Sequence, residues 1–589
     1  MHTTHCMRAA TGLLSLLLVA AAGQSLHAVV TPPAVRTLEL PPGYLTISAD
    51  DPLLAPILGG ATTTGAGPVV HDQVGKTLGL GKTLVTWRDT SDNRTASKYI
   101  YLYPYGWQVL GTAPNLRVFE HNGARHILYD RHNRVHVIYN DGVNVWHRIG
   151  VRIGGRLQWS SPLQVNDASS PIASSGYGTR GQTFALLYDP SGNVILQCVW
   201  SSTWPYNRAI LTRRLTIDAA GSAFSGPIVP TGLTGSFQCI AVDSTNTLHL
   251  AVELYSAITY MNSADGVNWL NYRTWNATQT GCSAYRFPNL VVDSKDRLHL
   301  LWQAEGYLGY GGSAMWWVGL YTMYNPQTAQ WSAPSNILAG IPGWQTPTGS
   351  QDILFAYPNM LIDDRDNLHV SWHGTARSFL FAWDDIFYLR RAYDPDTDTW
   401  GAWTDYAILH SRIHTLGGDG EDDNFSWVPS LAYRPGSDDL YAIFMLGTGD
   451  DEVDNPAVNL TDGGLKTRTG LTWQAGYENV TRSNDLRSWY PNAAPTVLVD
   501  ANGRTWLDMI WIDGTQNDYN VLFRRIDLGG GKTGDCDGDG KVNVFDLQIM
   551  ARSWNKAEGQ QGYDGRADLT GDKKVNVMDL QVMASGWNR

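Results

Sequence analysis

Seven stretches of the chain share one pattern of apolar and polar positions, in which an apolar strand, a polar turn and a second apolar strand follow one another. Two clear examples are N-L-V-V-D-S-K-D-R-L-H-L-L-W and N-M-L-I-D-D-R-D-N-L-H-V-S-W. The equivalent positions in the seven stretches are His136, Ile195, His249, His299, His369, Tyr441 and Trp506. They follow one another at intervals of 50 to 72 residues. Repeats of this length, each holding a few strands and a hairpin, are typical of a β-propeller, whose blades bury their faces against one another.

The number of blades depends on one earlier part of the chain. The stretches G-K-T-L-V-T-W-R-D and S-K-Y-I-Y-L-Y, between residues 81 and 103, predict strands of a degenerate repeat. They either complete a ring of seven blades, which we favour, or form an eighth. We therefore predict an all-β propeller over residues 68–528. A leader rich in Pro, Gly and Thr precedes it over residues 29–67, and a flexible Gly-rich linker follows over residues 529–534.

The histidine of the repeat recurs at one position in four of the seven stretches, as His136, His249, His299 and His369. A catalytic residue acts once in a site, whereas a side chain that recurs at one position of several repeats usually serves the architecture. We therefore expect these four side chains to make structural hydrogen bonds.

The end of the chain carries two acidic twelve-residue stretches, D-C-D-G-D-G-K-V-N-V-F-D and D-L-T-G-D-K-K-V-N-V-M-D. A loop that offers oxygen atoms at positions 1, 3, 5, 7, 9 and 12 holds Ca²⁺, with position 7 acting through its backbone carbonyl. The predicted ligands of the first loop are Asp535, Asp537, Asp539, Lys541, Asn543 and Asp546. Those of the second are Asp568, Thr570, Asp572, Lys574, Asn576 and Asp579. Because Thr570 replaces a carboxylate and Lys573 replaces the turn glycine, we expect the second loop to bind Ca²⁺ more weakly.

An apolar helical run follows each loop, and no helix clearly precedes either one. This duplicated loop and helix resembles a dockerin domain, which we assign to residues 535–589 as a small all-α calcium-binding module. The resemblance implies calcium-dependent docking into a cohesin module. The residues that would contact this partner are Val544, Phe545, Val577 and Met578. The alternative is a calcium-stabilised end cap that has no partner.

The beginning of the chain and its overall composition bear on where the protein works. Residues 1–28 hold a positive start, an apolar core and small residues, which predicts a secretory signal peptide. No later segment is apolar enough to span a membrane. A net charge of −12, with 17% charged residues, argues against nucleic acid as a partner. Export permits disulfides, and Cys239 and Cys282 are the one pair that we consider.

The propeller prediction narrows the search for chemistry. In a hairpin, the start of the first strand and the end of the second lie at the same end, so these positions line one face of the ring. The catalytic candidates chosen in this way are Glu253, Glu305, Tyr357 and His373. The substrate-binding candidates are His126, Trp200, Tyr285, Arg286 and Trp427.

These candidates support two chemistries. Glu253 and Glu305 come from consecutive repeats, and paired carboxylates at a sugar bond are how most glycosidases work. Tyr357 and His373 stand at the two ends of one hairpin, where they would divide the roles of general base and general acid. Arg286 would bind the carboxylate of an acidic sugar. The alternative is that these groups satisfy one another in a polar funnel.

The stretch A-Y-P-N-M-L-I-D-D-R-D-N-L-H-V-S-W-H-G-T resembles the BNR-type repeat family that includes propeller ulvan lyases. Tyr357 and Pro358 match the opening of a strand in that family, but His373 stands where the family has Arg, and Phe425 where it has Tyr. The stretch Y-R-F-P, at Tyr285, is similar to the strand opening of sialidases.

The sequence as a whole predicts a secreted carbohydrate-active protein. Its propeller would degrade a polysaccharide, by hydrolysis or by elimination, and its dockerin-like tail would tether it to a cohesin-bearing protein. The alternatives are a glycan-binding propeller without catalysis and a protein-binding assembly component.

Overall fold

The structure is a computed structural model. It describes residues 29–529, 534, 536 and 542–587, apart from a set of internal gaps. The gaps are residues 42–43, 65, 114–115, 120–122, 154–155, 173, 176–177, 180, 204–207, 219–220, 255, 281, 308–314, 340, 342–354, 375–384, 411–425, 449–459, 482–486, 500–503, 516–517 and 571–572. The predicted signal peptide, most of the linker and residue 425 lie outside the described residues.

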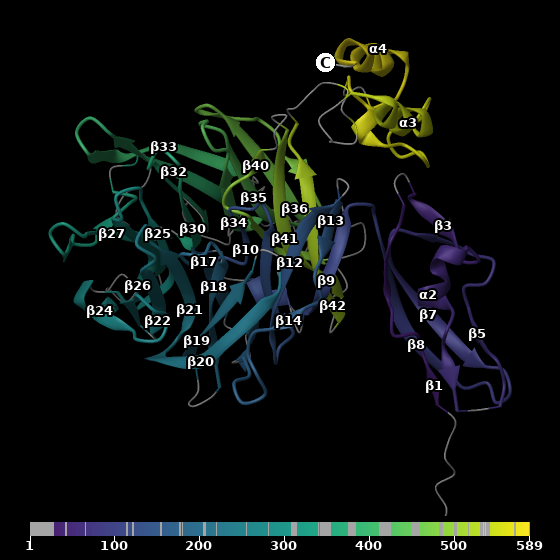
Figure 1. The fold of residues 1–589 in the computed structure, drawn as a ribbon, viewed down its shortest axis with the longest axis horizontal. Coiled ribbons are helices and arrows are strands. Elements are labelled where there is room, and N and C mark those ends of the chain that lie inside the picture. The colour runs from purple at the N-terminus through teal and green to yellow at the C-terminus, as the bar shows by residue number, and fades with distance from the viewer. Residues whose placement is uncertain are drawn as a thin grey trace, which may run out of the picture. The chain divides into compact units, whose positions relative to one another are not determined.

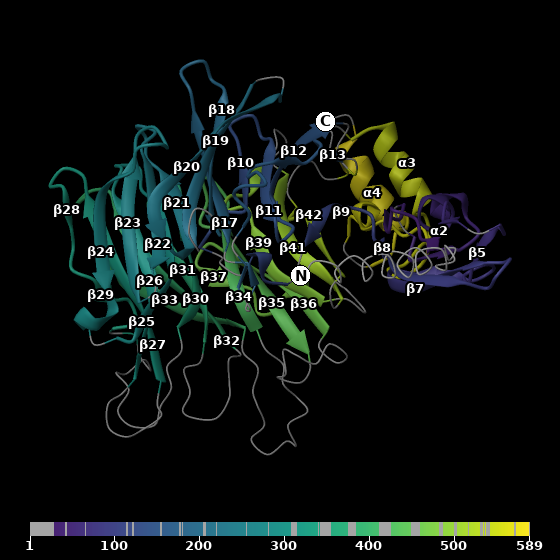
Figure 2. The ribbon, with the colours of Figure 1, turned by 90° about the horizontal axis from the view of Figure 1, so that it is seen from below.

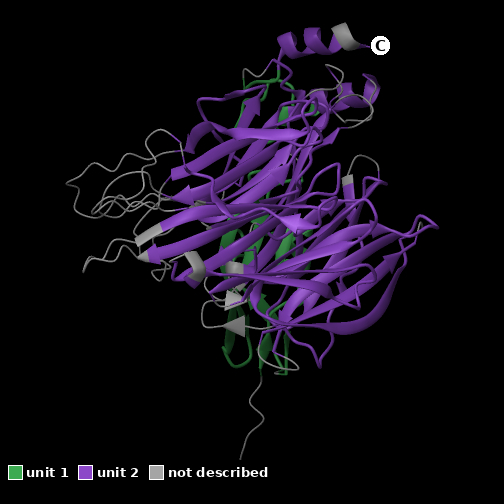
Figure 3. Cartoon of the chain, turned by 90° about the vertical axis from the view of Figure 1, so that its left-hand side faces the viewer, with its two compact units in different colours: residues 1–105, 552–565, 573–575 green, residues 106–551, 566–572, 576–589 purple. Residues whose placement is uncertain are grey.

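The described chain forms two compact units, which Figure 3 shows in different colours. The first unit consists mainly of the residues up to Tyr105, and it also includes residues 552–565 and 573–575. Its N-terminal strands are β1 (Val30–Thr31), β2 (Thr37–Glu39), β3 (Thr46–Ser48), β4 (Thr62–Thr63), β5 (Val69–His71), β6 (Thr77–Gly79), β7 (Gly81–Asp89) and β8 (Thr95–Tyr103). Two short helices accompany them, η1 (Pro52–Leu54) and α2 (Ala55–Leu58).

The strands β7 and β8, which the sequence analysis placed in a degenerate blade, lie instead in a separate sheet of order β2-β8-β7-β5. Their alternating apolar side chains, among them Val85, Trp87 and Ile100, are buried together with Leu54 of η1. Trp87 also donates a hydrogen bond from its indole nitrogen to the Leu58 carbonyl, at 2.9 Å. The expected leader thus supplies strands and a helix to the core that covers β7 and β8, and the boundary expected at residue 68 is replaced by one after Tyr105.

The second unit is mostly β and begins with five antiparallel sheets that follow one another along the chain (Figures 1 and 2). The strands of the first two sheets are β10 (Ile127–Tyr129), β11 (Val135–Asn140), β12 (Val145–Ile153), β13 (Arg156–Trp159), β14 (Leu163–Gln164), β17 (Gln182–Tyr188), β18 (Val194–Ser202), β19 (Ala209–Ile217) and β20 (Ala223–Thr234). A two-stranded ribbon stands between them, β15 (Ser174–Ser175) and β16 (Gly178–Thr179).

The next three sheets are also antiparallel, and their strands lie in sequence order, except that the short last strand of the fourth sheet pairs with the third strand of that sheet. The strands of the third and fourth sheets are β21 (Ser236–Val242), β22 (Leu248–Leu254), β23 (Ala257–Ser263), β24 (Leu270–Asn276), β25 (Ala284–Val292), β26 (Leu298–Tyr307), β27 (Met315–Asn325), β28 (Gln330–Trp331) and β29 (Ser335–Asn336). Those of the fifth are β30 (Ala356–Ile362), β31 (Leu368–Gly374), β32 (Asp385–Asp394) and β33 (Thr399–His410). The 3₁₀ helix η3 (Ala277–Thr280) precedes β25.

The remaining strands form a ten-stranded sheet in which β36 and β39 share a single residue pair, Thr461 with Arg487. Its strands are β34 (Ser426–Tyr433), β35 (Leu440–Thr448), β36 (Leu460–Thr469), β37 (Thr472–Trp473), β38 (Glu478–Asn479), β39 (Arg487–Ala493), β40 (Leu498–Val499), β41 (Thr505–Thr515), β42 (Asp518–Asp527) and β9 (Trp107–Ala113). The pairing of β42 with β9, visible in Figure 1, joins the last strand of the series to the first residues of the unit. All seven predicted hairpins are present among these strands.

Backbone amides of β30, β34 and β39 donate hydrogen bonds to polar side chains of β25, β30 and β34, respectively. Asn289 of β25 accepts one from the Met360 amide of β30, and Asn359 of β30 accepts one from Leu431 of β34, at 3.1 and 2.9 Å. Ser430 of β34 accepts a third from Ala493 of β39, at 3.0 Å. A polar side chain at an equivalent position thus ties each of these strands to the next.

The segment at residues 123–126 lies among these first strands. Arg125 donates from its guanidinium to the Met360 carbonyl of the fifth sheet and from its amide to Thr183 of the second, both at 3.0 Å. A Cβ atom added to Gly123 would lie 2.6 Å from the Asn289 side chain of the fourth sheet. One short segment therefore fills the space between three sheets.

The four repeated histidines make the structural hydrogen bonds expected of them. In β22, β26 and β31 the histidine Nε2 lies 3.1 to 3.3 Å from an aspartate six residues earlier, and Nδ1 lies 2.7 to 2.8 Å from a tyrosine hydroxyl on the third strand. His136 of β11 pairs with Asp130 and His147 instead. Burial lowers the pKa of His299 and His369, so both rings are neutral and each can donate to its aspartate and accept from its tyrosine.

Candidate functional site

The ends of three strands in the third and fourth sheets bring two carboxylates to one guanidinium. Arg286, near the start of β25, lies with its Nε 2.7 Å from Oε1 of Glu305, at the end of β26. Its Nη1 lies 3.9 Å from Oε1 of Glu253, at the end of β22. The Arg286 side chain is 41% exposed, whereas those of Glu305 and Glu253 are 15% and 4% exposed. These three side chains form what we call the carboxylate–arginine cluster, which reaches solvent mainly through Arg286 and has a formal charge of −1.

Burial and hydrogen bonding give the two carboxylates different surroundings. Burial raises the pKa of Glu305, although Arg286 and the Gln303 amide, which donates to Glu305 at 2.8 Å, both act to lower it. Glu253 accepts a hydrogen bond from the backbone amide of Phe287, at 3.3 Å. A carboxyl with a raised pKa beside a second carboxylate is an arrangement that can divide the roles of acid and base.

A β-bulge in the first strand shapes this end of each sheet. Phe287 and Tyr357 have φ angles of 51° and 47°, in the left-handed region that side chains other than glycine rarely adopt. Each stands where the pairing register shifts, between Arg286 and Asn289 and between Ala356 and Asn359. A bulge re-aims the residues around it, and here it turns the Phe287 amide toward Glu253.

The second predicted pair lies beside the cluster. The rings of Tyr357 and His373 are stacked, with centroids 5.1 Å apart and an interplanar angle of 21°. The Tyr357 amide donates to the Gln303 side chain at 3.3 Å, so the pair is connected to the carboxylate–arginine cluster. His373 itself is fully buried, and its Nδ1 accepts from the Val428 amide at 3.5 Å.

Burial lowers the pKa of His373 to about 3. The ring is therefore neutral across the physiological range, and its burial keeps it from contact with a substrate. The structure thus brings Tyr357 and His373 together, as predicted, but it buries the histidine side chain in the protein interior.

The predicted substrate-binding residues have mixed outcomes. Arg286 is exposed in the cluster, but Trp200 and Tyr285 are 0% and 1% exposed and pack in the cores of their sheets. Substrate contact does not fit such burial. His126 is also buried, with its ring 4.9 Å from that of Phe119, and burial lowers its pKa to about 3. The side chain of Trp427 lies outside the described part of the structure.

Two functional groups were absent from the sequence analysis. Gln303 is buried and connects Glu305 to the Tyr357 amide, and the Phe287 amide binds Glu253. Gln303 stands two residues before Glu305 on one strand, so the period-two alternation would have placed it on the same face. No sequence signal reveals that the Phe287 amide binds Glu253. Phenylalanine does not by itself favour the left-handed backbone conformation that directs this amide.

The two C-terminal loops are closed by equivalent hydrogen bonds. Asp546 and Asp579 are fully buried at position 12, and each accepts from the amide of the asparagine three residues before it, both at 2.8 Å. Asp579 also accepts from the amide and hydroxyl of Thr570, at 2.9 Å. Burial acts to raise the pKa of Asp579, but these hydrogen bonds keep it below its ordinary value. A buried carboxylate at position 12 of both loops fits the donor set of a Ca²⁺ site.

Only part of the predicted ligand set can be placed. Asn543, Asp546, Asp568, Thr570, Lys574, Asn576 and Asp579 are described, and the other predicted ligands lie outside the described residues. These are Asp535, Asp537, Asp539, Lys541 and Asp572. Among the residues that are described, no group of three or more His, Cys, Asp or Glu side chains gathers in a way that could hold a metal.

The helices that follow the loops are α3 (Val544–Arg552) and α4 (Val577–Gly586), with the short 3₁₀ helix η4 (Gly565–Ala567) between them. The predicted partner residues open these helices and are exposed: Val544 by 52%, Phe545 by 58%, Val577 by 55% and Met578 by 53%. Four exposed apolar side chains at equivalent positions are what a docking surface requires. The cysteines Cys198, Cys239, Cys282 and Cys536 are buried thiols, and the disulfide considered for Cys239 and Cys282 is not formed.

Comparison with known families decides what the C-terminal loops belong to. Residues 533–585 match the dockerin type I domain. The dockerin match confirms the resemblance on which the tail was assigned, and domains of this type generally bind calcium. No curated protein matches the chain.

Three of the solved structures that are similar to the chain share 10% to 12% sequence identity with it. A polysaccharide lyase, Uly1, has 10% sequence identity and a TM-score of 0.40, over 70% of this chain and 91% of its own. An α-L-arabinanase from Penicillium chrysogenum, solved with arabinobiose, has 12% identity and a TM-score of 0.33, over 58% and 92%. An α-L-arabinofuranosidase from Fusarium graminearum has 12% identity and a TM-score of 0.37, over 61% and 97%.

Among the described residues, no helix is long and apolar enough to cross a bilayer.

Proposed function

We propose that the second unit is a glycoside hydrolase that cleaves a polysaccharide and that Glu305 and Glu253 are its catalytic pair. The observation that carries this proposal is the single guanidinium of Arg286 between the two carboxylates. Two carboxylates that contact one guanidinium lie no farther apart than the roughly 10 Å that is the upper limit for the catalytic pair of a glycosidase. Glu305, with its raised pKa, is the general acid, and Glu253 is the carboxylate that acts as base or nucleophile.

The elimination route is the second candidate, and it rests on the stacked Tyr357 and His373. We rank it lower because His373 is buried and its pKa is lowered to about 3. An elimination also needs a cation to neutralise the acidic group of its substrate. Arg286, the cation beside the pair, is already bound by two carboxylates.

The fold that carries this site is proposed to be a closed ring of seven blades over residues 106–528. The five successive sheets supply five blades. The ten-stranded sheet supplies two more if it is divided at β36 and β39, which share one residue pair. The strand β9 then completes the last blade by pairing with β42, so that the two ends of the unit close the ring.

The tail is proposed to bind two Ca²⁺ ions, one in each loop, and to dock into a cohesin module through Val544, Phe545, Val577 and Met578. The dockerin match and the exposure of these side chains support this proposal. Together with the signal peptide predicted over residues 1–28, it makes the protein a secreted enzyme that is held at an extracellular assembly.

The substitutions Glu305→Gln and Glu253→Gln test the catalytic pair. Each should lower kcat on a cleaved polysaccharide by about 10²–10⁴-fold, because a positioned acid or base contributes that much to the rate. Glu39→Gln, in the first unit, is the matched control and should leave the rate unchanged. Retention of full activity in both cluster variants would refute the assignment.

A further inference from the structure

The side chain of Gln303 connects a backbone amide of the fifth sheet to a carboxyl group of the fourth. Gln303 stands on β26 and is 1% exposed. Its Oε1 accepts a hydrogen bond from the Tyr357 amide at 3.3 Å, and its Nε2 donates to Oε1 of Glu305 at 2.8 Å. A backbone amide can only donate, so the glutamine oxygen faces Tyr357 and the glutamine nitrogen faces Glu305. The direction of this side-chain amide is therefore fixed from outside the carboxylate–arginine cluster.

The same position in the neighbouring sheets also carries a hydrogen-bond acceptor. Glu253, Gln303 and His373 each stand opposite the residue at which the pairing register of their own sheet begins to shift. Each accepts a hydrogen bond from the amide of a left-handed residue in the first strand of the next sheet, and these residues are Phe287, Tyr357 and Val428. Glutamine meets this shared requirement and still has an NH₂ group to donate, which an ionised carboxylate lacks. The residue type at position 303 thus adds a donor to the site.

Two donors converge on one oxygen of Glu305. Nε of Arg286 lies 2.7 Å from Oε1, which is the oxygen that also accepts from Gln303. In the part of the chain that the structure describes, Oε2 of Glu305 makes no hydrogen bond. A proton on Oε1 would point at N–H groups that can only donate, whereas a proton on Oε2 leaves both contacts intact. The neutral form of Glu305 therefore carries its proton on Oε2.

We propose that Gln303 is a positioning residue, which holds the proton of Glu305 on Oε2 and so decides which oxygen acts as the acid. The proposal rests on the proposed function for the role of Glu305, and it deepens that role by naming the oxygen that donates. In the reaction, the proton passes from Oε2 to the oxygen of the departing sugar, which keeps the electron pair of the broken C–O bond. The carboxylate left behind is the form that the Gln303 donor stabilises.

The same contacts set how readily Glu305 releases its proton. Burial raises the pKa of Glu305, whereas the Arg286 guanidinium on β25 and the Gln303 donor lower it. Glu253 on β22 lies 3.9 Å from the same guanidinium, and its charge offsets part of the effect of Arg286. Loss of the Gln303 donor should therefore raise the pKa of Glu305 and move the basic limb of kcat/KM to higher pH.

Infrared difference spectroscopy of the full chain between low and high pH tests where the proton lies. A protonated carboxyl group has a C=O stretching band, and the band of Glu305 is the one that Glu305→Gln removes. With the proton on Oε2, the carbonyl oxygen is Oε1, and its two donors should lower the frequency of this band below that of a free carboxylic acid. Gln303→Met should raise the frequency. It should also lower the ionisation constant of Glu305 about ten-fold or more, which is the effect of one hydrogen bond to a charged group.

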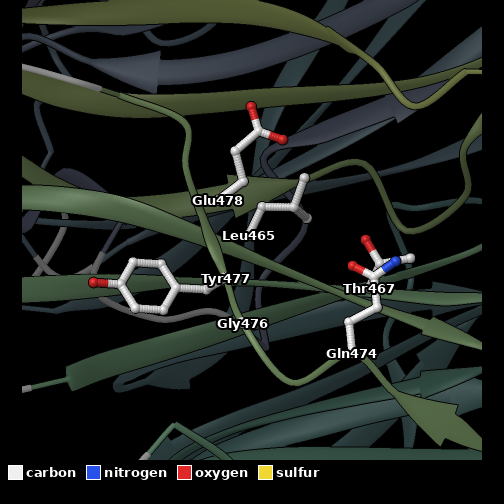
Figure 4. Close-up of a pocket in the computed structure, with 6 residues that line it drawn as sticks. All are labelled: Leu465, Thr467, Gln474, Gly476, Tyr477 and Glu478. Atoms are coloured by element: carbon white, nitrogen blue, oxygen red, sulfur yellow. The ribbon is translucent and has the colours of Figure 1, made fainter. Parts of the chain in front are cut away.

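Two other glutamines supply matched controls. Gln182→Met removes a buried glutamine of the second sheet, which accepts a hydrogen bond from Asn140 at 2.7 Å. Gln474→Met changes an exposed glutamine that lines a hollow of about 260 Å³, formed by β36, β38 and the segment between them (Figure 4). The lining of this hollow includes no residue of the carboxylate–arginine cluster. Both controls should leave the frequency and the titration of the Glu305 band unchanged.

Two results would overturn the inference. One is a wild-type Glu305 band at the frequency of a free carboxylic acid, and this result needs no variant, so it counts even if Gln303→Met does not fold. The other is a band that has the same frequency and titration in Gln303→Met as in wild type. Failure of the proposed function looks different: full turnover by Glu305→Gln together with a lowered wild-type band would refute the acid and leave the placement of the proton intact. Loss of turnover in Glu305→Gln without a lowered band would refute the placement alone.

Discussion

Arg286 is the side chain on which the proposed chemistry of the carboxylate–arginine cluster depends. It neutralises part of the charge of Glu253 and Glu305 and is itself 41% exposed. The sequence predicted it as a cation for an acidic sugar, because Y-R-F-P is similar to the strand opening of sialidases. The structure shows it paired with two carboxylates, so it tunes them instead of meeting an anion alone.

The pH dependence of catalysis should report this tuning. Activity requires protonated Glu305, so kcat/KM should fall as the pH rises through the pKa of this group. Arg286 lowers that pKa, and Arg286→Met should therefore raise it and move the basic limb of the profile to higher pH. Arg273→Met, an exposed change on β24, is the control and should leave the limb in place. An unchanged limb in Arg286→Met would remove Glu305 from the role of general acid.

Other single residues show where sequence reasoning stops. Glu253, Arg286 and Glu305 come together because hairpin logic fixes which strand ends share a face. Trp200 and Tyr285 were chosen by the same logic, but they are buried. Successive side chains at a strand end point to opposite faces of the sheet. Only the packing of the neighbouring sheet decides which of these side chains is covered.

Among the structural elements, the calcium loops show how an unusual residue is accommodated. Lys573 occupies the position at which the first loop has Gly540, and its φ is 68°. A side chain at such a φ crowds its own backbone, which glycine avoids. This strain is a conformational reason for the prediction that the second loop binds Ca²⁺ more weakly than the first.

Replacement of this lysine should relieve the strain. Lys573→Gly should stabilise the dockerin by about 1 kcal/mol, because a left-handed residue costs roughly 1–2 kcal/mol and its ion pair with Glu558 is exposed. Urea unfolding of the full chain, with and without added calcium, would measure the gain in stability from the unfolding transition of this domain. Lys574→Gly, whose φ is not positive, should destabilise the same loop. A loss of stability in Lys573→Gly would show that its side-chain contacts outweigh the strain.

The hairpins themselves were the most predictable elements. All seven follow from an apolar run, a polar turn and a second apolar run, and the repeated histidines follow from their recurrence. The separate N-terminal sheet was missed because Val85, Trp87 and Ile100 alternate like a blade strand, and only the pairing of β8 with β2 reveals a different partner.

At the scale of the whole second unit, the proposed ring depends on β9. Trp107 at its start is 5% exposed and packs edge-on against Trp511 of β41, with centroids 5.1 Å apart. A strand from the beginning of the unit thus completes a sheet formed by its end. Closure of this kind couples the last sheet to the first and removes exposed edges.

Removal of this contact should destabilise the entire unit. Trp107→Ala should lower its free energy of unfolding by about 3–5 kcal/mol, as for other buried aromatic residues. Tyr105→Ala, two residues earlier and 41% exposed, should cost little. Urea unfolding followed by tryptophan fluorescence compares the two variants. A loss below about 1 kcal/mol for Trp107→Ala would mean that β9 is an accessory strand and not the closure of the ring.

The products formed from a polysaccharide test the central claim most directly. The full chain would be incubated with arabinan, arabinoxylan, galactomannan and polygalacturonate, while new reducing ends and ultraviolet absorbance are recorded together. Hydrolysis by Glu305 and Glu253 predicts new ends from a neutral polymer without new absorbance, and their loss in Glu305→Gln. New ends accompanied by absorbance would mean elimination at Tyr357 and His373 and would contradict the proposed mechanism, as would the absence of new ends from every polymer.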